Sequence, residues 1–217
     1  MSNAPSSQKF KLSGVRAVFP KFFKGQEEAF QGKGDPYYSG AFLIETTDKQ
    51  VELVKAMIRD AAAKKYGDKA EAMLKIFAAK DKLPVHDGDI KADKAYGAAY
   101  KGKLYVSARN NARTNPPVPV FDNVIDSATG LARVIDSAND IKAPYSGCYV
   151  NVFLNFFAYN AGGGEGIGAS ILGVQFAKDG ERLAGGVLTK ADDYEAIPDS
   201  ASPQSVAASG KGAASLF

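Results

Sequence analysis

Residues 145–159 read Tyr145-Ser-Gly-Cys-Tyr-Val-Asn-Val-Phe-Leu-Asn-Phe-Phe-Ala-Tyr159, and this stretch alternates two kinds of side chain. A β-strand places successive side chains on opposite faces. One face is apolar throughout: Val150, Val152, Leu154, Phe156 and Ala158. The other face consists of rings separated by asparagine amides: Tyr149, Asn151, Phe153, Asn155, Phe157 and Tyr159. The first face indicates a strand that packs on a core, and the second indicates a surface on which unpaired bases could stack.

The rest of the chain predicts a mainly β protein with a helical insertion. Turn and breaker residues bound five expected strands, at residues 10–19, 37–45, 102–109, 147–159 and 167–177. Helical spacing and Gly67 predict two helices within residues 47–80. Five strands and few helices favour a five-stranded barrel of the oligonucleotide/oligosaccharide-binding (OB) type, with a β-sandwich as the alternative.

Composition favours one domain without a membrane span. We expect a flexible N-terminus at residues 1–9, a single domain at 10–190 and a disordered, partly acidic tail at 191–217. No run of residues is long and apolar enough to span a bilayer, and the polar start argues against secretion. Cys148 is the only cysteine, which excludes an internal disulfide and fits a reducing cytosol.

The net charge of +3 conceals an asymmetry between the two halves of the chain. Residues 1–113 carry 21 Lys and Arg against 13 Asp and Glu, whereas residues 114–217 carry 6 against 11. A basic first half is compatible with a polyanionic partner. Lysines on the two exposed helices supply part of this excess, which is the plainer interpretation.

Rings and cations occur together in several expected strands and loops, which favours binding of single-stranded nucleic acid. Stacking tolerates any base, and Lys or Arg side chains neutralise phosphates. The alternative is that some of these rings complete the core. The candidate stacking residues are Phe19, Tyr105, Tyr149, Phe153 and Tyr159, and the candidates for backbone contact are Lys21, Lys24, Lys103, Arg109 and Arg113.

Catalytic chemistry finds little support in the sequence. His86 is the only histidine, and no Gly-x-Ser-x-Gly motif is present. The glycines at 162–168 lie between two expected strands, so they do not form a dinucleotide fingerprint. No cofactor or metal site is expected. The acids Asp87, Asp89 and Asp93 lack the spacing of a calcium loop and are better interpreted as turn residues, although they leave a metal-dependent nuclease as a minor alternative.

The C-terminal segment combines acids with an apolar end, and two interpretations stay open. Such a segment can compete with DNA or recruit a replication protein, or it can be a plain disordered terminus. The candidate residues for contact with a partner protein are Asp192, Asp193, Glu195, Asp199 and Phe217.

Several motifs resemble one bacteriophage family. They are residues 145–152, Tyr159-Asn160, Gly166-Ile167 and 173–186, together with residues 12–21, 86–89 and 106–110. The family was long catalogued only as a domain of unknown function and is associated with single-stranded DNA binding; the match runs from about residue 10 to 186. The resemblance implies an OB barrel similar to the replicative single-strand binders of lytic phages, whose acidic tail ends in Phe.

The expected function is therefore that of a non-enzymatic protein that coats and protects single-stranded DNA in phage replication or recombination, with little sequence specificity. The rival is a structural or protein-interaction barrel whose aromatic face meets another protein.

Overall fold

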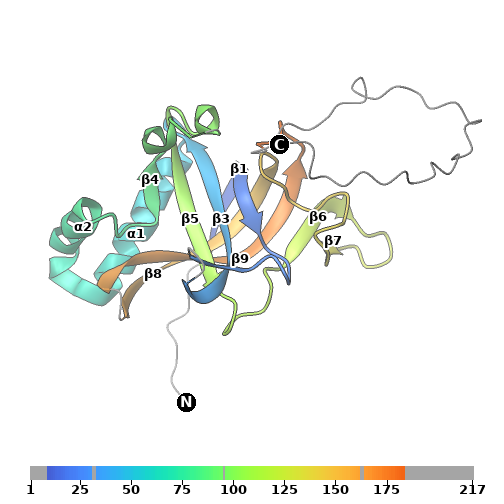
Figure 1. Ribbon diagram of the computed structural model, residues 1–217. Helices are drawn as coiled ribbons and strands as arrows, with labels where there is room; N and C mark the ends of the chain where they lie inside the picture. The colour runs from blue at the N-terminus through green and yellow to red at the C-terminus, as the bar shows by residue number, and fades with distance from the viewer. Residues whose placement is uncertain (1–8, 31–32, 95, 162–163, 184–217) are drawn as a thin grey trace, which may run out of the picture. The chain divides into compact units, whose positions relative to one another are not determined.

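The computed structural model describes residues 9–30, 33–94, 96–161 and 164–183. The described residues form one nine-stranded sheet and two α-helices (Figure 1). Neither helix is long and apolar enough to cross a membrane. The strands are β1 (Phe10–Lys21), β2 (Glu28–Phe30), β3 (Lys33–Glu45), β4 (Val85–Asp87), β5 (Lys103–Asn111), β6 (Val120–Ile125), β7 (Ala132–Ile135), β8 (Tyr149–Ala161) and β9 (Gly164–Lys178), and the helices are α1 (Gln50–Tyr66) and α2 (Ala70–Ala79).

Five of these strands form the expected barrel. They lie in the order β5-β3-β1-β8-β9, and each neighbouring pair is antiparallel. The two outer strands meet through Asn110 of β5, whose Nδ2 donates to the carbonyl of Ile171 at 2.8 Å and whose Oδ1 accepts from its N–H at 2.9 Å. The expected count of five strands is too low for the whole sheet, because β2, β4, β6 and β7 extend its edges.

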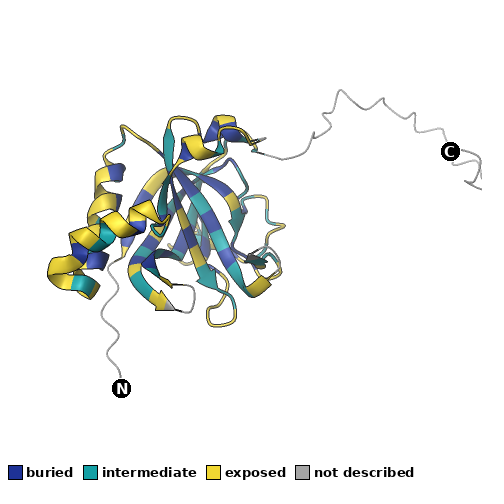
Figure 2. Cartoon of the chain, turned by 60° about the vertical axis from the view of Figure 1, so that its left-hand side comes forward, coloured by how far each residue is buried: buried dark blue, intermediate teal, exposed yellow. Residues whose placement is uncertain are grey.

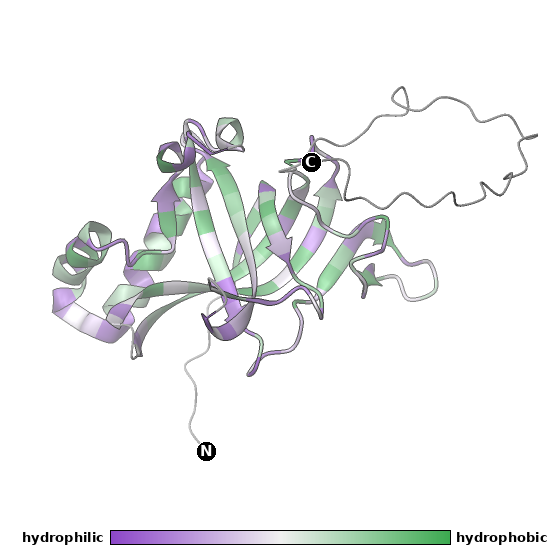
Figure 3. Cartoon of the chain, viewed as in Figure 1, coloured by the Kyte–Doolittle hydropathy of each residue, from purple (hydrophilic) through white to green (hydrophobic). Residues whose placement is uncertain are grey.

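The alternation along β8 is confirmed. Val150, Val152 and Leu154 are fully buried in the barrel core, and hydrophobic bands alternate with polar ones along the strands (Figure 3). On the outer face, Asn151 Oδ1 accepts the N–H of Gly14 where the β1–β8 register shifts, and its Nδ2 donates to Gln175. That amide therefore supports the sheet. Burial raises the pKa of the Cys148 thiol to about 11, in keeping with a structural cysteine.

The helical insertion covers one end of the barrel. Helices α1 and α2 begin and end within three residues of the expected limits. Val51, Val54 and Ile58 of α1 are buried in the barrel core, while the outer sides of the helices are exposed (Figure 2). The long β8–β9 hairpin runs beneath the helices (Figure 1). Its Ile167 N–H donates to the carbonyl of Lys82, which follows α2, so the insertion supports this hairpin.

Residues 88–94 and 96–100 form a cover over part of the outer face of β1, β3 and β5. They contain two 3₁₀ turns, Gly88–Lys91 and Gly97–Ala99. The carboxylate of Asp87 accepts the N–H of Asp89, and Asp89 in turn accepts the N–H of Gly102. Beneath the cover lies a second hydrophobic cluster, separate from the barrel core: Val18, Leu43, Ala99, Tyr100 and Tyr105.

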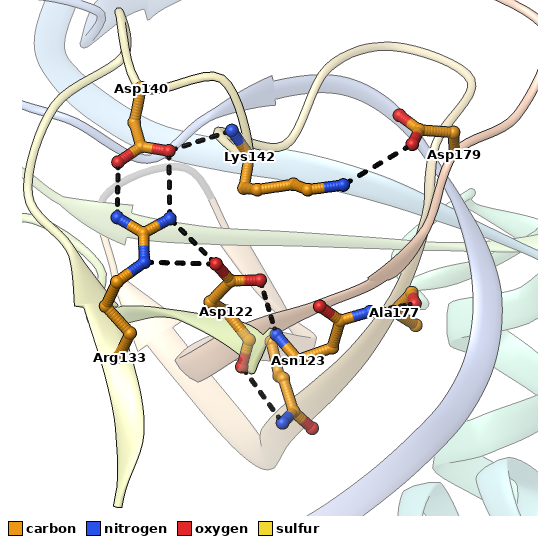
Figure 4. Close-up of polar contacts among 8 residues, drawn as sticks. Asp122, Asn123, Arg133, Asp140, Lys142, Ala177 and Asp179 are labelled. Atoms are coloured by element: carbon orange, nitrogen blue, oxygen red, sulfur yellow. Dashed lines mark hydrogen bonds and ion pairs between the residues drawn. The ribbon is translucent and has the colours of Figure 1, made fainter. Parts of the chain in front are cut away.

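Residues 120–135 form the β6–β7 hairpin, which lies outside the five expected strands. Its anchor is Arg133, which lies between two carboxylates (Figure 4). The guanidinium donates to Asp122 at 2.7 and 3.1 Å and to Asp140 at 2.7 and 3.1 Å. Asp122 is only 2 % exposed, so the ion pair satisfies a carboxylate that is out of contact with water. The hydrogen bonds from Arg133, together with the Lys142 N–H, lower the pKa of Asp140 to about 2.

Candidate nucleic-acid interface

A groove with a volume of about 810 Å³ crosses the open part of the barrel's outer face. We call it the sheet groove. Tyr37 of β3 and Ser107 and Arg109 of β5 line it from the sheet, and Phe157 and Tyr159 line it from the β8–β9 hairpin. Residues 81–84 and His86, between the insertion and β5, complete the lining. Three segments that are distant in the sequence therefore build one surface.

Arg109 and Tyr37 form the basic part of the sheet groove. The Arg109 guanidinium carbon lies 4.9 Å from the centroid of the Tyr37 ring, within the range of a cation–π contact. Arg109 is exposed, and among the described residues it forms no ion pair. Its charge is therefore available to a phosphate, while the neighbouring ring restricts where the guanidinium lies.

Phe157 and Tyr159 form the aromatic wall. Both lie on the outer face of β8, two residues apart, so their side chains project in the same direction. Phe157 is 40 % exposed although it lies within a paired strand. The residues opposite on β9 are glycines, Gly168 beside Phe157 and Gly166 beside Tyr159. Rings that are open to solvent on a rigid strand are suited to stacking with bases.

The prediction for Tyr105 is wrong in one respect: its ring does not present an open face. Tyr105 is 5 % exposed, lies on the outer face of β5 beneath the cover, and stacks on His86 with ring centroids 4.9 Å apart. The Lys91 ammonium lies 4.7 Å from the Tyr105 centroid. Burial raises the pKa of Tyr105, as expected for a hydroxyl removed from water. Tyr105 and Arg109 lie on the same face of β5, but the cover lies over Tyr105 and leaves Arg109 in the sheet groove.

Phe19 is exposed and lies at the other end of the outer face. Its backbone has a φ of 47°, a strained value for a bulky residue, and its N–H donates to Ser146 Oγ. The ring is 41 % exposed and packs edge-to-face on Tyr96 of the cover, with centroids 4.7 Å apart. Nearby in the chain, Lys21 is paired with Glu28, whereas Lys24 is exposed.

Other predicted residues are dispersed. Tyr149 and Lys103 line a small separate cavity of about 160 Å³, where Lys103 pairs with Glu45 at 2.7 Å. The ammonium of Lys178 lies 4.6 Å from the centroid of the Tyr149 ring. Phe153 lies in another cavity, of about 820 Å³, between the β6–β7 hairpin and the outer face of β8 and β9.

The remaining candidates fall at the margin of the sheet groove or outside the described residues. Arg113 pairs with Asp35 at 2.9 Å, close to the groove residue Asn111, which also bonds to Asp35. The tail candidates Asp192, Asp193, Glu195, Asp199 and Phe217 lie outside the described residues. Among the predicted residues that the structure describes, Arg109 and Tyr159 line the sheet groove, and the others do not.

Sequence reasoning missed Tyr37 and Asn110 and left Phe157 out of the candidate site. Phe157 lies on the same face of residues 149–159 as the candidates Phe153 and Tyr159, so the alternation alone could have identified it as a candidate stacking residue. Tyr37 follows Asp35-Pro36 at the start of an expected strand, a position that carries no signal of its own. The role of Asn110 depends on which strands close the barrel.

The acids that could have supported a nuclease do not gather. Within the described ranges there is no group of three or more His, Cys, Asp or Glu side chains that could hold a metal ion. The carboxylates of Asp87 and Asp89 instead bond to backbone N–H groups of turns. His86 Nδ1 lies 3.0 Å from Asp81 Oδ1, at the edge of the sheet groove.

The strand order and the contact of β5 with β9 define a barrel of the OB class. Across its outer face lies a groove lined by aromatic rings and the Arg109 guanidinium. The comparisons with known proteins agree. A family model described as "Enterobacter phage Enc34, ssDNA-binding protein" matches residues 8–205, and the chain belongs to this family. "Putative protein p50" of Acyrthosiphon pisum secondary endosymbiont phage 1 is 33% identical over 190 residues, which are 86% of this chain and 92% of that protein.

Two solved structures share the fold. The single-stranded DNA-binding protein from bacteriophage Enc34, in complex with ssDNA, matches with a TM-score of 0.63 and 21% identity, covering 81% of this chain and 89% of that one. Gp2.5, a single-stranded DNA-binding protein encoded by bacteriophage T7, matches with a TM-score of 0.51 and 12% identity, covering 92% of this chain and 100% of that one. The expected mainly β fold with a helical insertion and the resemblance to the phage family are confirmed.

Proposed function

We propose that this protein binds single-stranded DNA in the sheet groove. The observation that carries the proposal is the arrangement of Arg109 on Tyr37 in one groove with the exposed ring of Phe157 and the half-buried ring of Tyr159. Membership of the Enc34 family supports it, since that family takes its description from an ssDNA-binding protein. Bases stack on the rings, and the guanidinium neutralises a phosphate and releases its counterion.

The path of the DNA follows from the open surface. From the aromatic wall it crosses Tyr37 and Arg109 and continues over the small side chains of Ser39 and Ala41 of β3 toward Phe19. Phe19 then provides a further ring, and the exposed Lys24 of the following turn is a candidate for contact with the DNA backbone. Tyr149, Phe153, Lys21, Lys103 and Arg113 remain candidates at the periphery, because each lies outside the groove or is already paired.

Binding should show little dependence on sequence. Stacking contributes about 1–3 kcal/mol per base and accepts every base, since each has a π-face. Sequence readout needs hydrogen bonds to base edges. The open polar groups of the groove are few, because the amides of Asn110 and Asn111 are bonded to Ile171 and Asp35.

The biological role that fits this chemistry is coating and protecting unpaired DNA during phage replication or recombination in the host cytoplasm. The protein acts without catalysis, since its relatives are described as binding proteins and its turn acids cap backbone N–H groups. The acids at 192–199 and Phe217 would recruit replication proteins. We further propose that residues 10–190 form one domain, preceded by an N-terminal segment at 1–9 and followed by a partly acidic C-terminal tail at 191–217.

A titration tests the proposal. Fluorescent oligo-dT is titrated with the protein at several salt concentrations, with duplex of equal length as the competitor. We expect tight binding at low salt, preference for the single strand, and a log–log salt slope of about −0.7 per phosphate contacted. Absence of binding at low salt would refute the proposal and leave the aromatic face to a protein partner. Cleavage of the labelled strand with magnesium or manganese present would refute the non-enzymatic assignment.

A further inference from the structure

Two rings of the aromatic wall lie against glycines of the neighbouring strand. Phe157 is paired with Gly168, and Tyr159 with Gly166, across the β8–β9 ladder. A Cβ added at Gly168 would lie 3.0, 3.3 and 3.5 Å from three atoms at the distal end of the Phe157 ring. A Cβ at Gly166 would lie 2.5 Å from the Tyr159 hydroxyl and 2.8 Å from the ring carbon that carries it. Each ring therefore occupies the space that a side chain on β9 would take.

Space, and not backbone freedom, explains why these two residues are glycines. Neither has a φ in the left-handed region, so any residue could adopt their backbone conformation. Gly164, at the turn of the same hairpin, differs: its φ is 107° and nothing lies near its Cβ position. A glycine inside a strand weakens it, and it is often found where another group approaches closely. The glycine-rich run thus has two parts with different functions.

We propose that Gly168 and Gly166 are positioning residues for base stacking. They let Phe157 and Tyr159 lie across β9, with the rest of each ring open to the sheet groove. This inference rests on the proposed binding of single-stranded DNA and deepens it. Without the glycines, the rings would have to swing away from β9 and out of the geometry that accepts a base.

A side chain at Gly166 would meet a second group besides the Tyr159 ring, namely the backbone that follows the helical insertion. Its Cβ position lies 2.7 Å from the backbone oxygen of Lys82, which also accepts the N–H of Ile167 at 3.0 Å. A side chain at 166 would therefore press on rigid backbone as well as on Tyr159. Gly166→Ala is expected to destabilise the protein, so it is not the informative variant. The three atoms nearest to the Cβ position of Gly168 all belong to the movable Phe157 ring, which makes Gly168→Ala the cleaner test.

The experiment compares Gly168→Ala, Phe157→Ala and the double variant in the full chain, with oligo-dT as the probe. Gly173→Ala is the matched control. It is the same substitution in the same strand, at a glycine whose nearest neighbours lie 3.6 and 4.0 Å from the Cβ position. Thermal unfolding is measured for each variant, and affinity is measured at several salt concentrations.

Gly168→Ala is expected to weaken binding about fivefold or more, up to the loss seen in Phe157→Ala, since one stacked base corresponds to roughly 5- to 100-fold in affinity. Its Tm should not fall, and its salt slope should equal that of the wild type because the phosphate contacts are untouched. The double variant should bind no more weakly than Phe157→Ala, which is the non-additivity expected of residues that act through one contact. Gly173→Ala should bind like the wild type.

Wild-type affinity in Gly168→Ala, or additive losses in the double variant, would overturn the inference. An unchanged affinity in Phe157→Ala would also overturn it, while leaving the proposed function to the other groups of the groove. Failure of the wild-type protein to bind oligo-dT would refute the proposed function itself, so the two failures are distinguishable.

Discussion

The side-chain amide of Asn110 replaces the backbone ladder at the point where the barrel closes. It donates to the carbonyl of Ile171 and accepts from the N–H of the same residue, at 2.8 and 2.9 Å. Among the described strands, β5 and β9 are not neighbours in the sheet order, so this pair of bonds stands in for a strand pairing. Asn110 also lines the sheet groove, which places the closure beside the candidate interface.

Replacing Asn110 with Ala should lower the free energy of unfolding by about 2 kcal/mol, because two hydrogen bonds are lost and each contributes about 0.5–1.5 kcal/mol. Denaturant unfolding measures this change. Asn123→Ala is the control, since its amide also bonds to a β9 carbonyl, that of Ala177, but is exposed and makes a single bond to it. Equal stability losses in the two variants would contradict the closing role of Asn110.

Arg133→Ala should destabilise the protein by about 3 kcal/mol. The substitution leaves the carboxylate of Asp122, 2 % exposed, without its cation, and breaking a buried ion pair from one side is costly. Arg133 itself is partly exposed, which keeps the expected loss at the lower end of the range for buried pairs. Thermal and denaturant unfolding give the value. A decrease in unfolding free energy below about 1 kcal/mol, the level of a surface ion pair, would show that the Arg133–Asp122 pair contributes little to stability.

Stability should depend on pH through Asp140. Its pKa in the folded protein is lowered to about 2 by the hydrogen bonds from Arg133 and the Lys142 N–H, whereas an unfolded Asp titrates near 3.9. A lowered folded-state pKa gives stability that is complete above the unfolded pKa and disappears as the pH falls through the folded one. The difference in unfolding free energy between wild type and Asp140→Asn should therefore be constant above about pH 5 and shrink toward pH 2. A difference that does not change over that range would exclude this role of Asp140.

Tyr105 and Tyr159 should respond differently to replacement by Ala. Tyr105 is buried beneath the cover, so its loss should destabilise the fold by about 3–5 kcal/mol, with little change in the DNA affinity of the folded fraction. Tyr159 lines the sheet groove, so its loss should weaken binding to oligo-dT by about 1–3 kcal/mol while the Tm changes little. Unfolding and titration on the same samples separate the two effects. A large loss of DNA affinity in folded Tyr105→Ala would show that the Tyr105 ring contributes to DNA binding after all.

Arg109→Ala should reduce the log–log salt slope for oligo-dT by about 0.7, the value for one phosphate contact on a single strand. Arg113→Ala should have a smaller effect, because that guanidinium is paired with Asp35. Salt titrations of both variants measure the slopes. A salt slope equal to that of the wild type in Arg109→Ala would show that Arg109 does not contact a phosphate of the DNA backbone.

Much of the fold could be predicted from periodicity alone. The alternation of residues 149–159 gave the inward face of β8, and the helical spacing of Val51, Val54 and Ile58 gave the buried side of α1. Alternation cannot show which outer faces a distant segment covers. Tyr105 and Arg109 share a face of β5, but the cover folds over Tyr105 only.

The candidate site was harder to predict than the strands, because the local sequence pattern does not show which distant segments lie together. The sheet groove depends on long-range placement, with Tyr37, Arg109 and Tyr159 brought together from three strands. The β6–β7 hairpin was missed because its stability comes from Arg133 meeting Asp122 and Asp140, a pairing that spacing along the chain does not reveal.

If single-stranded DNA lies in the sheet groove as proposed, the cover formed by residues 88–94 and 96–100 limits how long a stretch one molecule can contact. It fills the outer face of β1, β3 and β5 around Tyr100 and Tyr105, so an oligonucleotide lying in the sheet groove must turn aside near Ala41. The footprint of a single copy is therefore short. On this proposal, a long single strand is covered only by many copies bound in series, and the density of packing along the strand then depends on the protein concentration.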